Sequence, residues 1–168
     1  VCTAKAITNA YFPFGALMIA EGVAEVFEKD ETGKAAIGHG YTYSGHPVGA
    51  AAALATLAET KRLNVNENAA VRGAQLYAGL QALMAKYSVI GDIRGGHGLM
   101  LAIEMVGDRT TKSAPPKPVP GVVQAAAYEA GAMVRVSGPN IILSPPLVLT
   151  EADAQVILTA LDKGFAAL

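Results

Sequence analysis

Cysteine is nearly absent from this chain of 168 residues, and tryptophan is absent altogether. The single cysteine, Cys2, has no second cysteine with which to form an internal disulfide or the core of a zinc site. Proteins without disulfides are typical of reducing compartments. We therefore expect a cytoplasmic protein.

Charge is scarce and evenly balanced. Charged residues make up 16% of the chain, and 13 Lys and Arg against 14 Asp and Glu leave a formal net charge of -1. A basic excess is what draws proteins to nucleic acids and anionic membrane surfaces. We therefore expect neither nucleic acid nor a membrane as a partner.

Long apolar runs are missing too. The longest, from residue 48 to residue 58, reaches Glu59, Lys61 and Arg62 well short of the roughly 20 apolar residues that span a bilayer. No signal peptide is visible, and the first residue is Val1 instead of Met. We expect the chain to begin inside a longer protein. It is nonetheless 52% hydrophobic, which is enough for a core of domain size.

The first part of the sequence predicts short elements joined by loops. Residues 1 to 4 read as the end of a strand, so Lys5 follows where that strand ends. Residues 10 to 19 predict a turn and then a strand, and residues 21 to 28 predict a surface helix. A glycine-rich loop, GHGYTYSGHP at 38 to 47, ends at Pro47, which suits the first turn of a helix running to about residue 62.

The second part predicts its own set of helices and strands. Asn66 or Asn68 is expected to cap a helix with one apolar face, and residues 99 to 106 predict a strand that is apolar on both faces apart from Glu104. A helix at 122 to 130, strands near 133 to 136 and 141 to 144, and a final helix follow. Thr150 and Asp153 form the capping box of that last helix. A boundary near residue 63 divides the chain into domains at 1–63 and 64–168.

Lys5 is the first candidate for chemistry. At a strand end among Thr3, Ala4 and Ile7, it is expected to be poorly solvated, which lowers a lysine pKa and favours the neutral amine that imine formation needs. The alternative is an ordinary lysine whose stem packs on apolar neighbours while its ammonium reaches water.

The loop 38 to 47 is the second candidate. Its three glycine amides, the hydroxyls of Thr42 and Ser44, and the helix start behind it are features that bind phosphate. A tight turn that needs glycine explains the same pattern. Zinc is a poor interpretation of His39 and His46, because they are seven residues apart with no adjacent cysteine or carboxylate, and we expect no metal.

Two more residues leave alternatives open. His97 lies in GGHG, which matches no dinucleotide or P-loop fingerprint and reads as a bend before a strand. Arg135 falls within the apolar run AMVRVSG, where an unpaired guanidinium is costly. The guanidinium could pair with a substrate carboxylate, pair with a structural acid, or reach water.

Taken together, TAKAITNAYFPFGALMI and then HGYTYSGHPVGAAAALATL resemble the class III aminotransferases that depend on pyridoxal 5'-phosphate (PLP), particularly the amine:pyruvate and omega-amino acid branch. The resemblance continues through VIGDIRGGHGLMLAIEMV and MVRVSGPNIILSPPLVLTEADAQVI. It implies an α/β protein of the aspartate-aminotransferase-like fold (PLP fold type I). Residues 1–63 would be the end of the large PLP-binding domain, and residues 64–168 the C-terminal small domain.

The resemblance also implies roles for single residues. The lysine matching Lys5 holds PLP as a Schiff base and later moves a proton. The threonine matching Thr42 binds the cofactor phosphate across a homodimer interface, with Tyr41 beside it. The arginine matching Arg135 pairs with the carboxylate of the keto acid.

The reaction implied is transfer of an amino group from an amine or omega-amino acid to a keto acid such as pyruvate. The acid that faces the pyridine nitrogen and further phosphate-binding glycines precede the lysine in such enzymes, so we expect this chain to need the remainder of its N-terminal sequence. An aminomutase, racemase or decarboxylase of the same family is an alternative, as is a non-catalytic remnant or binding domain.

Overall fold

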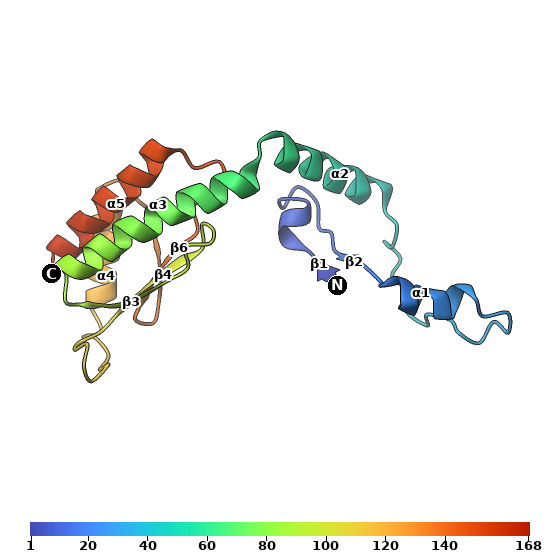
Figure 1. The fold of residues 1–168 in the computed structure, drawn as a ribbon, viewed down its shortest axis with the longest axis horizontal. Helices are drawn as coiled ribbons and strands as arrows, with labels where there is room; N and C mark the ends of the chain where they lie inside the picture. The colour runs from blue at the N-terminus through green and yellow to red at the C-terminus, as the bar shows by residue number, and fades with distance from the viewer. The chain divides into compact units, whose positions relative to one another are not determined.

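A computed structural model describes residues 1–168, which form two compact units, Val1–Leu63 and Asn64–Leu168 (Figure 1). None of its helices combines the length and the apolar character that crossing a membrane requires. The assignment of the two units to the large and small domains of an aminotransferase stays a prediction.

The first unit holds short elements around a long helix. Its elements are β1 (Cys2–Thr3), the 3-10 turn η1 (Lys5–Ile7), β2 (Ala16–Leu17), α1 (Glu21–Glu28) and α2 (Pro47–Arg62). Strands β1 and β2 pair antiparallel. The predicted strand end before Lys5, the helix at 21 to 28, and Pro47 in the first turn of α2 are confirmed.

The first unit buries few of its own apolar side chains. Gly49 of α2 lies against the rings of Phe12 and Phe14, and Ala53 is buried one turn further along. Other large side chains, such as Leu17 and Leu54, are exposed. This unit therefore contributes a site but no apolar core of its own.

The second unit is a four-stranded antiparallel sheet with three helices. Its elements are α3 (Val65–Lys86), β3 (Ile90–Arg94), β4 (Leu101–Met105), α4 (Val119–Glu129), β5 (Arg135–Ser137), β6 (Asn140–Leu143) and α5 (Glu151–Ala166). The strands lie in the order β3-β4-β6-β5, so β3 and β5 are the edges. The hairpin of β5 and β6 turns at Gly138, which has a positive φ of 58°, as the predicted SGPN turn requires.

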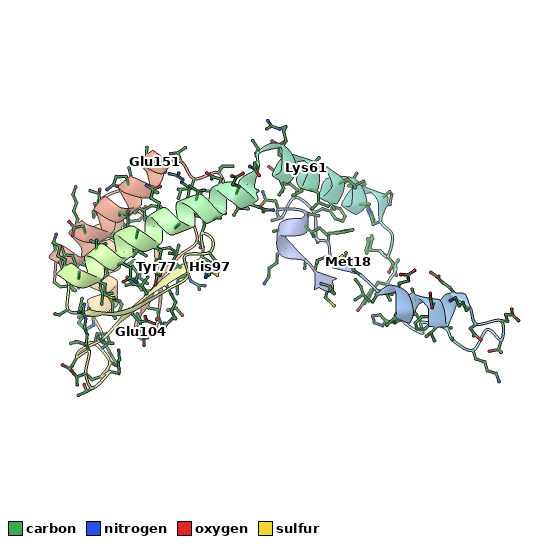
Figure 2. The ribbon with its side chains drawn as sticks, in the orientation of Figure 1. Met18, Lys61, Tyr77, His97, Glu104 and Glu151 are labelled. Atoms are coloured by element: carbon green, nitrogen blue, oxygen red, sulfur yellow. The ribbon has the colours of Figure 1, made fainter.

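One face of this sheet carries the core. Helices α3 and α5 lie side by side (Figure 1), and α5 also packs against α4. Leu80 of α3, Ile103 of β4 and Leu161 of α5 are fully buried in a single apolar cluster. Tyr77, labelled on α3 in Figure 2, packs against Gly96 in the turn between β3 and β4. We call the opposite side of the sheet, which no helix covers, the open face.

Strand β4 is apolar apart from Glu104, as expected, and its half-buried Ala102 and Glu104 lie on the open face between buried neighbours. Two other elements differ from expectation. Helix α3 begins at Val65, not beyond Asn66 or Asn68, after Asn64 takes a left-handed backbone with φ of 48°. Strand β3 was not predicted, because a glycine and an aspartate interrupt its apolar pattern.

The C-terminal helix begins as its sequence predicts. The Asp153 amide donates to the Thr150 hydroxyl at 3.1 Å, and the Thr150 amide donates to the Asp153 carboxylate at 3.1 Å. Both halves of the capping box are therefore present, and two amide groups at the start of α5 are satisfied.

Candidate functional site

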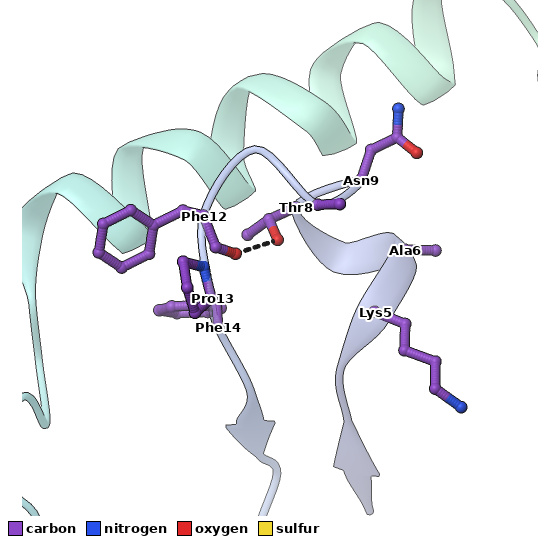
Figure 3. A pocket seen from close by; sticks show the side chains of 8 residues that line it. Lys5, Ala6, Thr8, Asn9, Phe12, Pro13 and Phe14 are labelled. Carbon is purple, nitrogen blue, oxygen red and sulfur yellow. Dashed lines mark hydrogen bonds between the residues drawn. The ribbon is translucent and has the colours of Figure 1, made fainter.

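Lys5 lies directly after β1, at the first position of η1. Its backbone is left-handed, with φ of 54°, which is uncommon for a residue with a side chain and is found preferentially at functional sites. The side chain forms no hydrogen bond or ion pair and extends away from α2 (Figure 3). The expectation that Lys5 is poorly solvated is wrong for this chain, in which the residue is exposed.

A cavity of about 600 Å³ lies beside Lys5, lined by residues of the turn between positions 5 and 14 (Figure 3). Thr8 is 1% exposed, and its hydroxyl donates to the Phe12 carbonyl at 2.7 Å, which fixes the shape of the turn. Asn9 and Phe12 contribute a polar and an apolar wall. The volume falls within the range of small-molecule and cofactor pockets, about 300–1,000 Å³.

The loop 38 to 47 presents its polar groups to solvent. The Tyr41 amide donates to the Ser44 hydroxyl at 3.1 Å, and the Tyr41 hydroxyl shares a hydrogen bond with His39 Nε2 at 3.0 Å. Thr42, between these bonded groups, is exposed and its hydroxyl has no partner. Neither Tyr41 nor Thr42 lines the cavity beside Lys5.

The loop leads directly into the N-terminus of α2. His46 occupies the cap position without a side-chain cap bond, and Pro47 is the first helical residue. The His46 ring lies near those of Phe12 and Tyr43, with centroid distances of 5.1 and 5.7 Å. Its Nδ1 is buried without a hydrogen-bond partner. An uncapped helix N-terminus behind a hydroxyl-bearing loop fits a phosphate group.

No acid of the first unit lines the cavity beside Lys5. Hydrogen bonds from the Thr32 hydroxyl and the Ala35 amide lower the pKa of Asp30 to about 2 and hold it within its own loop. Glu59 pairs with Arg62 on the surface of α2. Neither acid lines the cavity beside Lys5. The unit thus offers an unpaired lysine and a hydroxyl-bearing loop before a helix, but no acid beside the cavity to face a pyridine nitrogen.

Arg135 belongs to the second unit, on the edge strand β5, and it is exposed. It takes part in none of the ion pairs or side-chain hydrogen bonds of the chain. The sequence left three possible surroundings open for the Arg135 guanidinium: a substrate carboxylate, a structural acid or water. In this structure it faces water, and no acidic side chain pairs with it. The structure therefore leaves Arg135 available to an external anion.

A charged cluster on the open face was not singled out from the sequence. Arg94 donates to Glu104 at 2.7 Å and to the Asn140 side chain at 2.9 Å. The hydrogen bond with Glu104 raises the pKa of Arg94 above its ordinary value. The one sequence feature that pointed to this cluster was Glu104 as a single charged residue in an apolar strand. It did not identify Arg94 as the partner of Glu104.

Comparison with known proteins shows the family of the chain. The sequence matches the class-III aminotransferase family over residues 1–165. An uncharacterized aminotransferase (y4uB) of Sinorhizobium fredii is 39% identical over 98% of this chain. The taurine–pyruvate aminotransferase of Bilophila wadsworthia is 35% identical over the same share. The chain spans 36% and 38% of the length of these two relatives.

A solved structure extends the likeness to three dimensions. It is an amine transaminase from an uncultivated Pseudomonas species in its PLP-bound form, 42% identical to this chain with a TM-score of 0.89. The match covers 98% of this chain and 37% of that one. It confirms the predicted α/β fold of the aspartate-aminotransferase-like class (PLP fold type I). The chain therefore belongs to the class-III aminotransferase family.

Proposed function

We propose that the whole protein containing this chain is a PLP-dependent aminotransferase. It transfers an amino group from an amine or omega-amino acid to a keto acid such as pyruvate. The observation that carries the proposal is an unpaired lysine, Lys5, at a strand end beside a cavity of about 600 Å³, in a chain that belongs to this family throughout. The PLP-bound relative and the taurine–pyruvate relative support the cofactor and the acceptor.

Lys5 is the residue that would hold PLP covalently, through its Nζ. When bound, the cofactor supplies an electrophilic carbon and a sink for electrons. Lys5 supplies a flexible amine directly after a strand, and no hydrogen bond or ion pair engages its side chain. The same amine would also hold or move a proton at the substrate carbon.

Thr42 and Tyr41 bind the cofactor phosphate from the loop before α2. The support is that the Thr42 hydroxyl is unpaired, whereas Tyr41 and Ser44 bond to each other, so Thr42 can donate without disturbing the loop. Thr42 does not line the cavity beside Lys5 of the same chain. This is consistent with Thr42 binding the phosphate in the site of a second subunit. The assembly proposed is a homodimer with the site at the subunit interface.

Arg135 binds the carboxylate of the keto acid acceptor. The support is its exposure on β5 and its lack of any acidic partner, which leave the guanidinium able to form a bidentate pair with a carboxylate. The proposal does not specify the donor amine. The proposed location is the cytoplasm, because a chain with a single cysteine forms no internal disulfide.

Lys5 provides the test of this function. Whole protein loaded with PLP and treated with borohydride should carry the cofactor covalently on the peptide that contains Lys5, as read by mass spectrometry. Lys5→Ala should abolish both the labelling and amino transfer to pyruvate, because no other amine lines the cavity. Lys29→Ala, a surface lysine paired with Glu25, is the matched control and should change neither. Labelling of the Lys5→Ala protein at another lysine, with turnover intact, would refute the assignment.

A further inference from the structure

Two rows of side chains cross the open face of the sheet in the second unit. The strand register puts four residues in the first row, one from each strand in the order of the sheet: Arg94, Ala102, Ile142 and Arg135. An arginine therefore stands at each edge of the sheet, with two apolar side chains between them.

The second row, adjacent to the first, is acidic at one end and neutral at the other. Its members, in the same strand order, are Asp92, Glu104, Asn140 and Ser137. Figure 2 shows Glu104 on the side of the sheet that faces away from α3. The open face thus holds two arginines and two carboxylates, and the way they pair decides which guanidinium is available.

Arg94 forms hydrogen bonds with both carboxylates of this face, those of Asp92 and Glu104. It donates to Glu104 at 2.7 Å and to Asp92 at 3.2 Å, and its other terminal nitrogen donates to the Asn140 side chain at 2.9 Å. One guanidinium therefore holds the two acids, while Arg135 is left without any acidic partner. The asymmetry comes from the register, because Arg94 is the nearer arginine to both acids.

Glu104 is nonetheless within reach of Arg135. The two residues are two strands and one row apart, which corresponds to about 12 Å between Cα atoms at ordinary strand spacings. Both side chains are long and flexible and lie on the same face, so their charged ends can meet across Asn140 and Ile142. Without Arg94, a carboxylate on this face would compete with any anion for Arg135.

We propose that Arg94 is a positioning residue that holds Glu104 away from Arg135 and so keeps Arg135 available for the keto acid carboxylate. The inference rests on the proposed function. Arg94 does not itself touch the substrate, and its action is electrostatic and passes through Glu104. Exposed ion pairs add little to folding free energy, so the loss of Arg94 should leave the fold intact.

The experiment uses the PLP-loaded whole protein and an unreactive carboxylate, propionate, as a competitive inhibitor against pyruvate. Arg94→Met should weaken propionate binding and raise the KM for pyruvate about tenfold, within the usual range for coupled neighbours. The half-reaction with an amine that lacks a carboxylate should keep its rate. Arg94→Lys, which keeps the positive charge, should retain most of the propionate affinity.

The double variant separates positioning from a structural role. Glu104→Gln alone should bind propionate at least as well as the parent. Arg94→Met combined with Glu104→Gln should recover the parent affinity within about twofold, because the competing carboxylate is gone. Arg62→Met removes another exposed arginine that pairs with a Glu, and it should change nothing.

The outcomes are distinct. Unchanged propionate binding in Arg94→Met, or a loss that Glu104→Gln does not restore, overturns the inference while the proposed function stands. An Arg135→Ala protein that binds propionate like the parent overturns the substrate role of Arg135 itself, and the inference falls with it.

Discussion

At the scale of single residues, Thr42 differs from Tyr41 and Ser44 in that its hydroxyl forms no hydrogen bond within the loop. Tyr41 bonds through both its amide and its hydroxyl, and the Ser44 hydroxyl accepts the amide of Tyr41. The Thr42 hydroxyl is thus a donor that the loop does not use for itself. Its removal should therefore affect a bound phosphate and spare the loop.

Thr42→Ala tests this directly. Loss of one hydrogen bond to a charged group costs about 1.5 to 3 kcal/mol, so the dissociation constant of PLP from the whole protein should rise roughly ten- to 150-fold. Thr42→Ser keeps the hydroxyl and should keep the affinity. Thr32→Ala, which removes a hydroxyl bound to Asp30 in another loop, serves as control. An unchanged PLP dissociation constant in Thr42→Ala would favour the interpretation of the loop as a tight turn only.

The sequence predicted which residues are candidates for function better than it predicted whether those residues are buried or exposed. The motifs around Lys5 and Thr42 single out these residues by their amino-acid pattern alone. The exposure of Arg135 could not be predicted, because its apolar neighbours read as a buried strand, whereas β5 is a three-residue edge strand with an open face. Which side of a strand faces water depends on helices distant in the sequence.

At the scale of elements, glycine decides how closely α3 approaches the turn before β4. A Cβ built on Gly73 would lie 2.3 Å from the Gly98 carbonyl oxygen, a backbone atom that cannot rotate away. The helix and the turn are therefore in backbone contact at this point, and no larger residue fits without displacing one of them.

Gly73→Ala should lower the free energy of unfolding by about 1 to 3 kcal/mol, the usual cost of overpacking. Urea unfolding of residues 1–168, followed by circular dichroism, measures it. Gly121→Ala in α4 is the matched control, because nothing lies within 4 Å of its Cβ position. It should stabilise by up to about 1 kcal/mol through helix propensity. Equal effects of the two substitutions would contradict the close approach.

The capping box of α5 predicts a pH dependence. Hydrogen bonds from the Thr150 hydroxyl and then the Thr150 amide lower the pKa of Asp153 below its ordinary value. Because the folded pKa is depressed, the stabilisation is complete above the unfolded pKa of about 3.9 and is lost as the pH falls through the folded pKa. Asp153→Asn should lower the urea midpoint near neutral pH and make progressively less difference below about pH 4. A constant difference across this range would exclude the carboxylate as the cause.

Elements with strong local signals could be predicted, and those set by tertiary contact could not. The capping box and Pro47 mark their helices in the sequence. Strand β3 contains Gly91, which leaves room for the Val106 side chain, and the register shifts between Ile90 and Asp92. The conformation of β3 is therefore set by its pairing with β4. The sequence of β3 has no apolar periodicity that predicts a strand.

At the scale of the whole molecule, the two units differ in what they bury. The connected apolar cluster lies entirely in Asn64–Leu168, whereas the first unit leaves side chains such as Leu17, Val26 and Leu54 exposed. A segment of about 60 residues is marginal for independent folding even with a good core.

Residues 64–168 expressed alone should unfold in urea in a single cooperative transition with their helical circular dichroism intact beforehand. Residues 1–63 alone should show neither a cooperative transition nor amide protection from hydrogen exchange. The comparison needs both fragments at the same concentration, because association of the exposed apolar side chains would mimic folding. Cooperative unfolding of the first fragment as a monomer would show that its apolar contacts have been underestimated.

The strand order has a consequence for self-association. A sheet that ends in free edges can recruit a strand from another molecule, and proteins prevent this with short edge strands and charged side chains. Here β3 and β5 are the edges, β5 is only three residues long, and each edge carries an arginine, Arg94 or Arg135. The residues proposed to govern keto acid binding therefore also discourage the sheet from growing into aggregates, so a neutral side chain at either position would weaken both properties.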